Sequence, residues 1–147
     1  MTSTSDLSCR TTIVVGASRG LGRGIAAAFA EAGAPVIAVA RTATPLAELA
    51  AGNGIQPEVA DAADPSVAGQ LIDDYHPATV VLNAGASPLM RPLQHHTWET
   101  FSVNWHTDVR IAFHWLREAL LQPLRPGSRV VVISSGAAVA GSPLSGG

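Results

Sequence analysis

The sequence has 147 residues, a net charge of -2 at neutral pH, 47% hydrophobic residues and 14% charged ones. This length predicts one domain, and the composition excludes a disordered chain. The weak net charge favours neither nucleic acid nor an anionic membrane as a partner. No apolar run approaches the ~20 residues of a membrane span, and residues 1–10 lack a signal-peptide core, so we expect a cytoplasmic protein.

Short β-branched runs alternate with longer amphipathic stretches along the chain. The expected elements, in chain order, are a strand over residues 11–15, a helix over 21–32, a strand over 36–40, a helix over 44–51, a strand over 56–60, a helix over 65–75, a strand over 79–82, a helix over 98–121 and a strand over 129–133. Residues 136–147 are expected to form a loop. This alternation predicts right-handed crossovers and a parallel sheet.

Two of the helices carry a start signal in the sequence. Thr44 precedes Pro45, and Asp64 precedes Pro65. A capping side chain followed by proline is typical of a helix N-terminus. We therefore expect Thr44 and Asp64 to be the N-caps of the second and third helices.

A glycine-rich turn joins the first strand to the first helix. Gly16 permits a tight turn, Gly20 lets the backbone approach a pyrophosphate, and Gly22 lets the helix pack against the sheet. The helix N-terminus adds free N–H groups and a partial positive charge for phosphates. The strand before it and the helix after it favour a dinucleotide site over a turn without a ligand.

The segment VVGASRGLGRGIA, residues 14–26, resembles the cofactor turn of the short-chain dehydrogenase/reductase family. Later motifs follow in that family's order: Asp61 after the third strand, Asn83-Ala84-Gly85 after the fourth, Asn104 in the long helix and Ser135 after the fifth strand. The resemblance covers essentially the whole chain. It implies a Rossmann-type, doubly wound α/β fold with three layers and strand order 3-2-1-4-5, forming one dinucleotide-binding domain over residues 1–147.

The resemblance also assigns site residues. It gives Ser135 a hydrogen bond to the substrate oxygen and Asn104 the positioning of a relay water, with Ser134 as the alternative serine. It assigns no metal. The residues it places at the cofactor are Gly16, Ser18, Arg19, Gly20, Leu21, Gly22, Arg41, Asp61, Ala62, Asn83, Ala84 and Gly85.

Two arginines indicate which dinucleotide is bound. A carboxylate after the second strand would bind the ribose 2′-OH of NAD, but this chain has Arg41 there and Arg19 in the glycine turn. Two guanidinium groups can bind a 2′-phosphate through charge-assisted hydrogen bonds. We therefore expect NADP(H) rather than NAD(H), with a solvated strand-end charge as the other interpretation of Arg41.

The family's set of catalytic groups is incomplete in this sequence. The resemblance implies a tyrosine and a lysine, four residues apart, about a dozen residues after the serine; all nine cationic residues here are arginine, and Tyr75 is the single tyrosine. We expect the 147 residues alone to be inactive and the native enzyme to continue past Gly147. A truncated product that binds nucleotide and a second chain that carries the missing groups are the alternatives.

The resemblance implies a complete protein that transfers hydride between the nicotinamide and a carbonyl or alcohol substrate, as a homodimer or homotetramer. An inactive nucleotide-binding fragment or regulatory protein is the alternative. The strand over residues 129–133 is expected to leave an apolar sheet edge exposed. Histidines near the long helix, such as His96 and His106, are expected on the surface or in helix packing.

Overall fold

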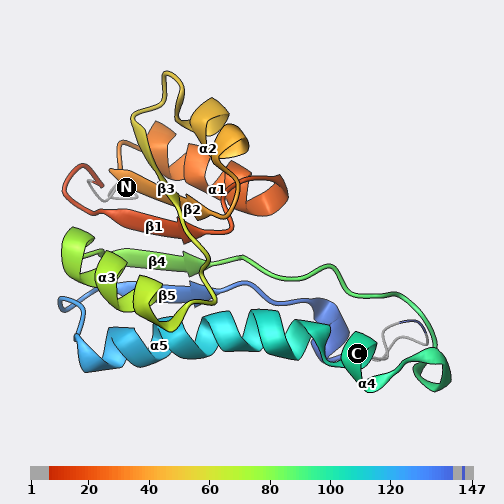
Figure 1. Cartoon of the computed structure of the whole chain (residues 1–147). Coiled ribbons are helices and arrows are strands. Elements are labelled where there is room, and N and C mark those ends of the chain that lie inside the picture. Colours follow the sequence, from red (N-terminus) through yellow and green to blue (C-terminus); the bar gives the residue numbers. More distant parts are fainter. Residues whose placement is uncertain (1–6, 141–143, 145–147) are drawn as a thin grey trace.

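The computed structural model describes residues 7–140 and residue 144, and these build one sheet with helices on both faces (Figure 1). The strands are β1 (Thr12–Val15), β2 (Val36–Ala40), β3 (Ile55–Val59), β4 (Thr79–Leu82) and β5 (Arg129–Val132). The helices are α1 (Gly20–Glu31), α2 (Ala43–Ala50), α3 (Pro65–Tyr75), α4 (Trp98–Phe101) and α5 (Arg110–Leu121). All strand pairs are parallel, in the order β3-β2-β1-β4-β5, which confirms the predicted fold class.

Alternate side chains of each strand build two separate cores, as the period of two in a strand requires. Ile13 and Val15 of β1 pack in the core that α3 and α5 cover. Val14, between them, packs in the core that α1 and α2 cover. Both faces of the sheet are therefore buried, and the fold has the expected three layers.

The register of the strands brings their carboxyl ends level with one another. Val15 of β1 lies opposite Val39 of β2 and Leu82 of β4, and Leu82 lies opposite Val132 of β5. The loops that follow these strands therefore meet at one edge of the sheet. Open α/β sheets bind their ligands at this edge.

One of the two predicted helix caps is correct. Asp64 is the N-cap of α3, and its Oδ1 accepts hydrogen bonds from the Ser66 amide and hydroxyl. These two bonds stabilise the carboxylate and lower the pKa of Asp64. Thr44 is not a cap, because α2 begins at Ala43 and Thr42 is its N-cap. Pro45 still lies in the first turn, where its missing N–H would have had no partner.

The helix predicted over residues 98–121 is helical over most of that range but is interrupted at Ser102. Thr97 and Thr100 cap α4 reciprocally, and that helix ends at Phe101. A π-helical turn, Trp105–Val109, then leads into α5. Threonine, valine and aspartate have low helix propensity, so tertiary contacts decide the conformation of this segment. Residues 136–138, expected as a loop, form a short 3₁₀ turn.

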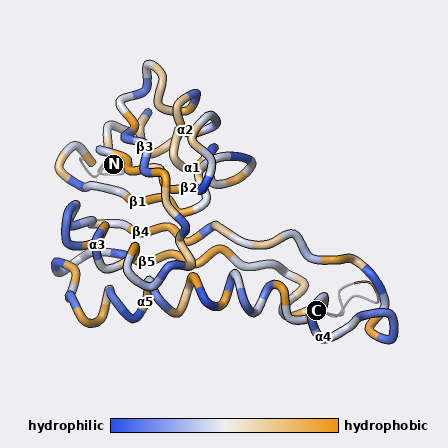
Figure 2. Tube along the Cα trace, viewed as in Figure 1, coloured by the Kyte–Doolittle hydropathy of each residue, from blue (hydrophilic) through white to orange (hydrophobic). Residues whose placement is uncertain are grey.

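Apolar side chains remain exposed along β5 and α5. Val131 and Val132 of β5 are 41% and 48% exposed, which confirms the expected apolar edge. Phe113 of α5 is 59% exposed, and apolar positions recur along the outer side of that helix in Figure 2. Among the described residues, no helix has the length and hydropathy to cross a membrane.

Candidate functional site

Two cavities open at the carboxyl edge of the sheet and share a wall. We call the first, of about 750 Å³, the glycine-turn cavity, and the second, of about 730 Å³, the serine cavity. Asn83, Ala84 and Gly85 line both. The loop after β4 therefore separates the two cavities.

The predicted cofactor residues gather around the glycine-turn cavity. Gly22 alone among them does not line it. The residues that do are Gly16, Ser18, Arg19, Gly20, Leu21, Arg41, Asp61, Ala62, Asn83, Ala84 and Gly85. Motifs spread over more than sixty residues of sequence thus meet in one place.

Gly22 lies behind the turn because no side chain fits there. A Cβ at residue 22 would lie 2.2 Å from the Gly16 carbonyl oxygen and 2.6 Å from Asn83 Nδ2. A Cβ at residue 16, where φ is +86°, would lie 2.6 Å from the backbone of Ala84. Sequence analysis predicted that Gly22 lets the helix pack against the sheet. In the structure, the nearest atoms to Gly22 belong to the Gly16 carbonyl and to Asn83. Close packing of α1 on the turn needs glycine at both positions.

The N-terminus of α1 faces this cavity with its first-turn amides uncapped. Its N-cap, Arg19, makes no side-chain hydrogen bond to the helix, and the first turn contains no acidic residue. Gly20, with φ at +55°, has open space where a Cβ would project. Free amides, the helix dipole and open space together suit an anionic group such as a phosphate.

Arg19 and Arg41 bring two positive charges to the same cavity. Both residues are exposed. Within residues 7–140, neither guanidinium forms an ion pair, whereas Arg23 donates to the Pro45 carbonyl at 3.3 Å and lies 4.0 Å from Glu48. Arg23 ties α1 to α2, while Arg19 and Arg41 stay available to a ligand.

The loop after β3 is held by a tryptophan that the sequence did not single out as a site residue. Trp115 of α5 is fully buried, and its indole Nε1 donates to the Ala62 carbonyl at 3.2 Å. The Asp61 carboxylate accepts a hydrogen bond from the Ala63 amide at 3.0 Å. Trp115 is therefore a core residue that also fixes this wall of the cavity.

Ser135 and Asn104 both line the serine cavity. The Ser135 hydroxyl accepts a hydrogen bond from the Ala137 amide at 3.2 Å, and Ser134 lines the same cavity. The Asn104 amide donates to the Ala86 carbonyl and to Asp108 Oδ2, each at 3.0 Å. The cavity thus brings the two predicted catalytic residues together and adds Asp108. Asp108 lies four residues after Asn104, a helical spacing that could have drawn attention to it.

Among the described residues that line the serine cavity, His96 is the one histidine. Its Nδ1 lies 3.1 Å from Thr100 Oγ1, and its Nε2 lies 3.2 Å from the Arg91 carbonyl oxygen. Both ring nitrogens are therefore engaged in packing the loop before α4. This agrees with the structural role expected for His96.

Tyr75 lies at the end of α3 and lines neither cavity. Its hydroxyl donates to the Glu58 carboxylate and lies 2.5 Å from Gln56 Nε2. The hydrogen bond to Glu58, followed by burial and the nearby charges of Glu58 and Asp74, raises the pKa of Tyr75 to about 12. A phenol that transfers protons near neutral pH needs a lowered pKa, so Tyr75 is unsuited to that role by both place and environment.

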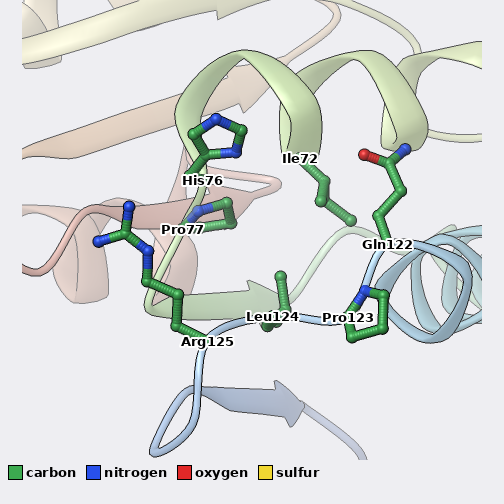
Figure 3. A pocket seen from close by; sticks show the side chains of 7 residues that line it. All are labelled: Ile72, His76, Pro77, Gln122, Pro123, Leu124 and Arg125. Atoms are coloured by element: carbon green, nitrogen blue, oxygen red, sulfur yellow. The ribbon is translucent and has the colours of Figure 1, made fainter.

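A third hollow, of about 370 Å³, lies where α3 and α5 end (Figure 3). Ile72, Pro77 and Leu124 give it apolar walls, and His76 and Arg125 bring polar groups to it. None of the predicted site residues lines this hollow.

Comparison with known proteins agrees with this geometry. Residues 10–146 match the sequence profile of the short chain dehydrogenases. L-xylulose reductase of Cavia porcellus is 32% identical over 105 residues, which cover 71% of this chain and 43% of that protein. Carbonyl reductase (NADPH) 2 of Sus scrofa is 30% identical over 126 residues, which cover 83% of this chain and 52% of that protein. The chain thus spans about half the length of these relatives.

The solved structures share the fold. The short-chain dehydrogenase/reductase of Brucella melitensis superposes with a TM-score of 0.85 at 23% identity, covering 96% of this chain and 62% of that one. At this identity the likeness bears on the fold alone.

Gly22→Ala should destabilise the protein, because the new Cβ would collide with backbone and with Asn83. Overpacking of this kind costs about 1–3 kcal/mol. Gly24→Ala is the matched control: its Cβ would meet no atom within 4 Å, and alanine raises helix stability by up to ~1 kcal/mol. Urea denaturation measures both free energies of unfolding. Equal effects of the two substitutions would contradict the close packing.

Ultraviolet titration of the single tyrosine should give a pKa near 12 for Tyr75. Glu58→Gln should move it toward the ordinary value of 10.0, while Glu31→Gln, at the end of α1, should leave it unchanged. Between pH 10 and 12 the folded protein keeps a phenol proton that the unfolded chain loses, so stability should fall over that range. An unshifted wild-type midpoint would refute the Glu58 contact.

Proposed function

Because the chain belongs to the short-chain dehydrogenase family, we propose that it is the dinucleotide-binding part of an NADP(H)-dependent oxidoreductase. The complete protein would interconvert a small carbonyl compound and its alcohol. The observation that carries the proposal is the glycine-turn cavity, where uncapped helix amides and two arginines without ion pairs face one space. The names of two relatives, L-xylulose reductase and carbonyl reductase (NADPH) 2, indicate that those proteins reduce carbonyl compounds.

The residues of the glycine-turn cavity fit a dinucleotide. Gly16 and Gly20 carry no side chain that would keep a pyrophosphate from the turn at these two positions, and the first turn of α1 offers amides to it. Asp61 and Ala62 border the cavity beyond β3, where we propose that the adenine lies. The wall of Asn83, Ala84 and Gly85 leads from this cavity to the serine cavity. A dinucleotide that extends past this wall can contact a substrate bound in the serine cavity.

The preference for NADP(H) rests on charge. Arg41 and Thr42 follow Ala40, the last residue of β2, so no carboxylate lies where one would repel a 2′-phosphate. Arg41 and Arg19 line the same cavity and can donate charge-assisted hydrogen bonds to a phosphate dianion. The name of the Sus scrofa relative includes NADPH, which favours the same cofactor.

In the serine cavity, we assign Ser135 to the substrate oxygen and Asn104 to the positioning of a water. The nicotinamide, when bound, supplies or accepts the hydride. Among the described residues, the Ser135 hydroxyl accepts from the Ala137 amide and donates to no group, so its own proton is available for a substrate carbonyl. The 147 residues contain no lysine, and Tyr75 is held by Glu58, so we expect these residues alone to bind dinucleotide without turnover.

We also propose that the protein assembles as a homodimer or homotetramer. Phe113, Leu116 and Leu120 of α5 are exposed, and an apolar helix face of this kind is typical of subunit interfaces. The second candidate function is nucleotide binding without catalysis. The lack of lysine favours it for the 147 residues taken alone.

NADPH should bind more tightly than NADH, by roughly tenfold or more, since a hydrogen bond to a charged group contributes ~1.5–3 kcal/mol. Arg41→Asp should weaken NADPH binding by at least about tenfold and should not weaken NADH binding, because the new carboxylate can accept a hydrogen bond from the ribose 2′-OH. Arg125→Asp makes the same charge change at the third hollow and should alter neither. Fluorescence titration measures all the affinities. Equal wild-type affinity for the two dinucleotides would rule out the phosphate contact.

Ser135→Ala in the complete enzyme should lower turnover of a carbonyl substrate by about 100-fold, in the range of a lost transition-state hydrogen bond. NADPH affinity should stay the same, because Ser135 does not line the glycine-turn cavity. Ser134→Ala is the control, since it lines the serine cavity one residue away. If Ser134→Ala causes the larger loss, the role belongs to Ser134.

A further inference from the structure

The carboxylate of Asp108 joins two parts of the site that are far apart in sequence. Its Oδ1 accepts a hydrogen bond from the Ala86 amide at 2.7 Å, and its Oδ2 accepts one from Asn104 Nδ2 at 3.0 Å. The same Asn104 amide donates to the Ala86 carbonyl at 3.0 Å. Asp108, Asn104 and Ala86 therefore form a closed set of three hydrogen bonds.

The π-helical turn and a glycine make this arrangement possible. Asn104 directly precedes the turn Trp105–Val109, and Asp108 lies within it, so both side chains reach the loop after β4. A Cβ at residue 85 would lie 3.0 Å from Asp108 Cγ and from both carboxylate oxygens. The Asp108 carboxylate therefore packs against the loop after β4 at Gly85, where there is no side chain to displace it.

The chemistry of the two donors favours a carboxylate at residue 108. Both partners, the Ala86 amide and the Asn104 amide, present N–H groups to it. An ionised carboxylate accepts at both oxygens and donates at neither, whereas an asparagine would accept at one position and donate at the other. Among the described residues Asp108 forms no salt bridge, and these two N–H groups are its hydrogen-bond partners.

We propose that Asp108 is a positioning residue that fixes Asn104 and the Gly85–Ala86 segment of the loop after β4. Gly85 lines both cavities, Ala86 lines the glycine-turn cavity, and Asn104 lines the serine cavity. A single side chain thus sets the shape of the passage between the proposed dinucleotide and substrate positions. The expected effect on NADPH affinity rests on the proposed function. The hydrogen bonds of Asp108 do not depend on it.

The test compares Asp108→Ala, Asp108→Asn and the control Asp73→Asn, which removes the same charge from an exposed position on α3. Amide hydrogen exchange is measured at Ala86 and at Asn83, whose amide donates to the Val15 carbonyl at 3.0 Å. We expect exchange at Ala86 to rise by roughly tenfold in Asp108→Ala, by less in Asp108→Asn and not in Asp73→Asn. Exchange at Asn83 should stay constant, because a positioning role loosens the loop and not the sheet.

NADPH affinity is measured on the same proteins. We expect roughly three- to tenfold weaker binding for Asp108→Ala, with Asp108→Asn between it and the wild type. Unchanged exchange at Ala86, or an equal rise at Ala86 and Asn83, overturns the positioning role. If Asp108→Ala does not fold, the milder Asp108→Asn decides by the same two amides. A wild type that binds no NADPH overturns the proposed function, and the exchange at Ala86 then still decides the role of Asp108.

Discussion

The contact between the glycine turn and the loop after β4 sets the rest of the site. The Gly16 carbonyl oxygen occupies the space that a side chain at residue 22 would need, and the Ala84 backbone occupies the space beside Gly16. Asn83 Nδ2 reaches the same Gly16 carbonyl at 3.4 Å. Because α1 can come this close, its N-terminus opens into a cavity whose far wall is the loop after β4. With any side chain at these positions, helix and wall would move apart.

This closeness explains why one loop serves two cavities. The loop after β4 is held from one side by Gly16 and from the other by Asn104 and Asp108 of the segment before α5. Its residues therefore have little freedom to shift toward either cavity. The loop after β3 is fixed independently through Trp115, a fully buried residue whose indole reaches the Ala62 carbonyl. The walls of the site thus depend on α5 as much as on the sheet.

The sequence was sufficient for features that local chemistry decides. Strand runs, the glycine turn and the Asp64 cap depend on residues near one another, and the structure contains all three. The break in the long helix could not be read from periodicity, because the Thr97–Thr100 cap and the bonds of Asn104 and Asp108 to Ala86 decide it. The predicted cap at Thr44 is wrong because Thr42, two residues earlier, is the N-cap of α2. The Thr42 side chain makes no hydrogen bond to the helix, so a rule based on capping side chains does not identify it.

The two cavities differ in what the described residues can supply. Binding an anionic dinucleotide needs free amides and positive charge, and the glycine-turn cavity has the α1 N-terminus, Arg19 and Arg41. Proton transfer needs a titratable group whose proton-carrying atom can reach the substrate. In the serine cavity, the polar atoms of His96 and Asp108 are engaged in hydrogen bonds that hold loops. The described residues therefore complete the binding and positioning parts of the proposed reaction, and its proton transfer requires a side chain other than these two.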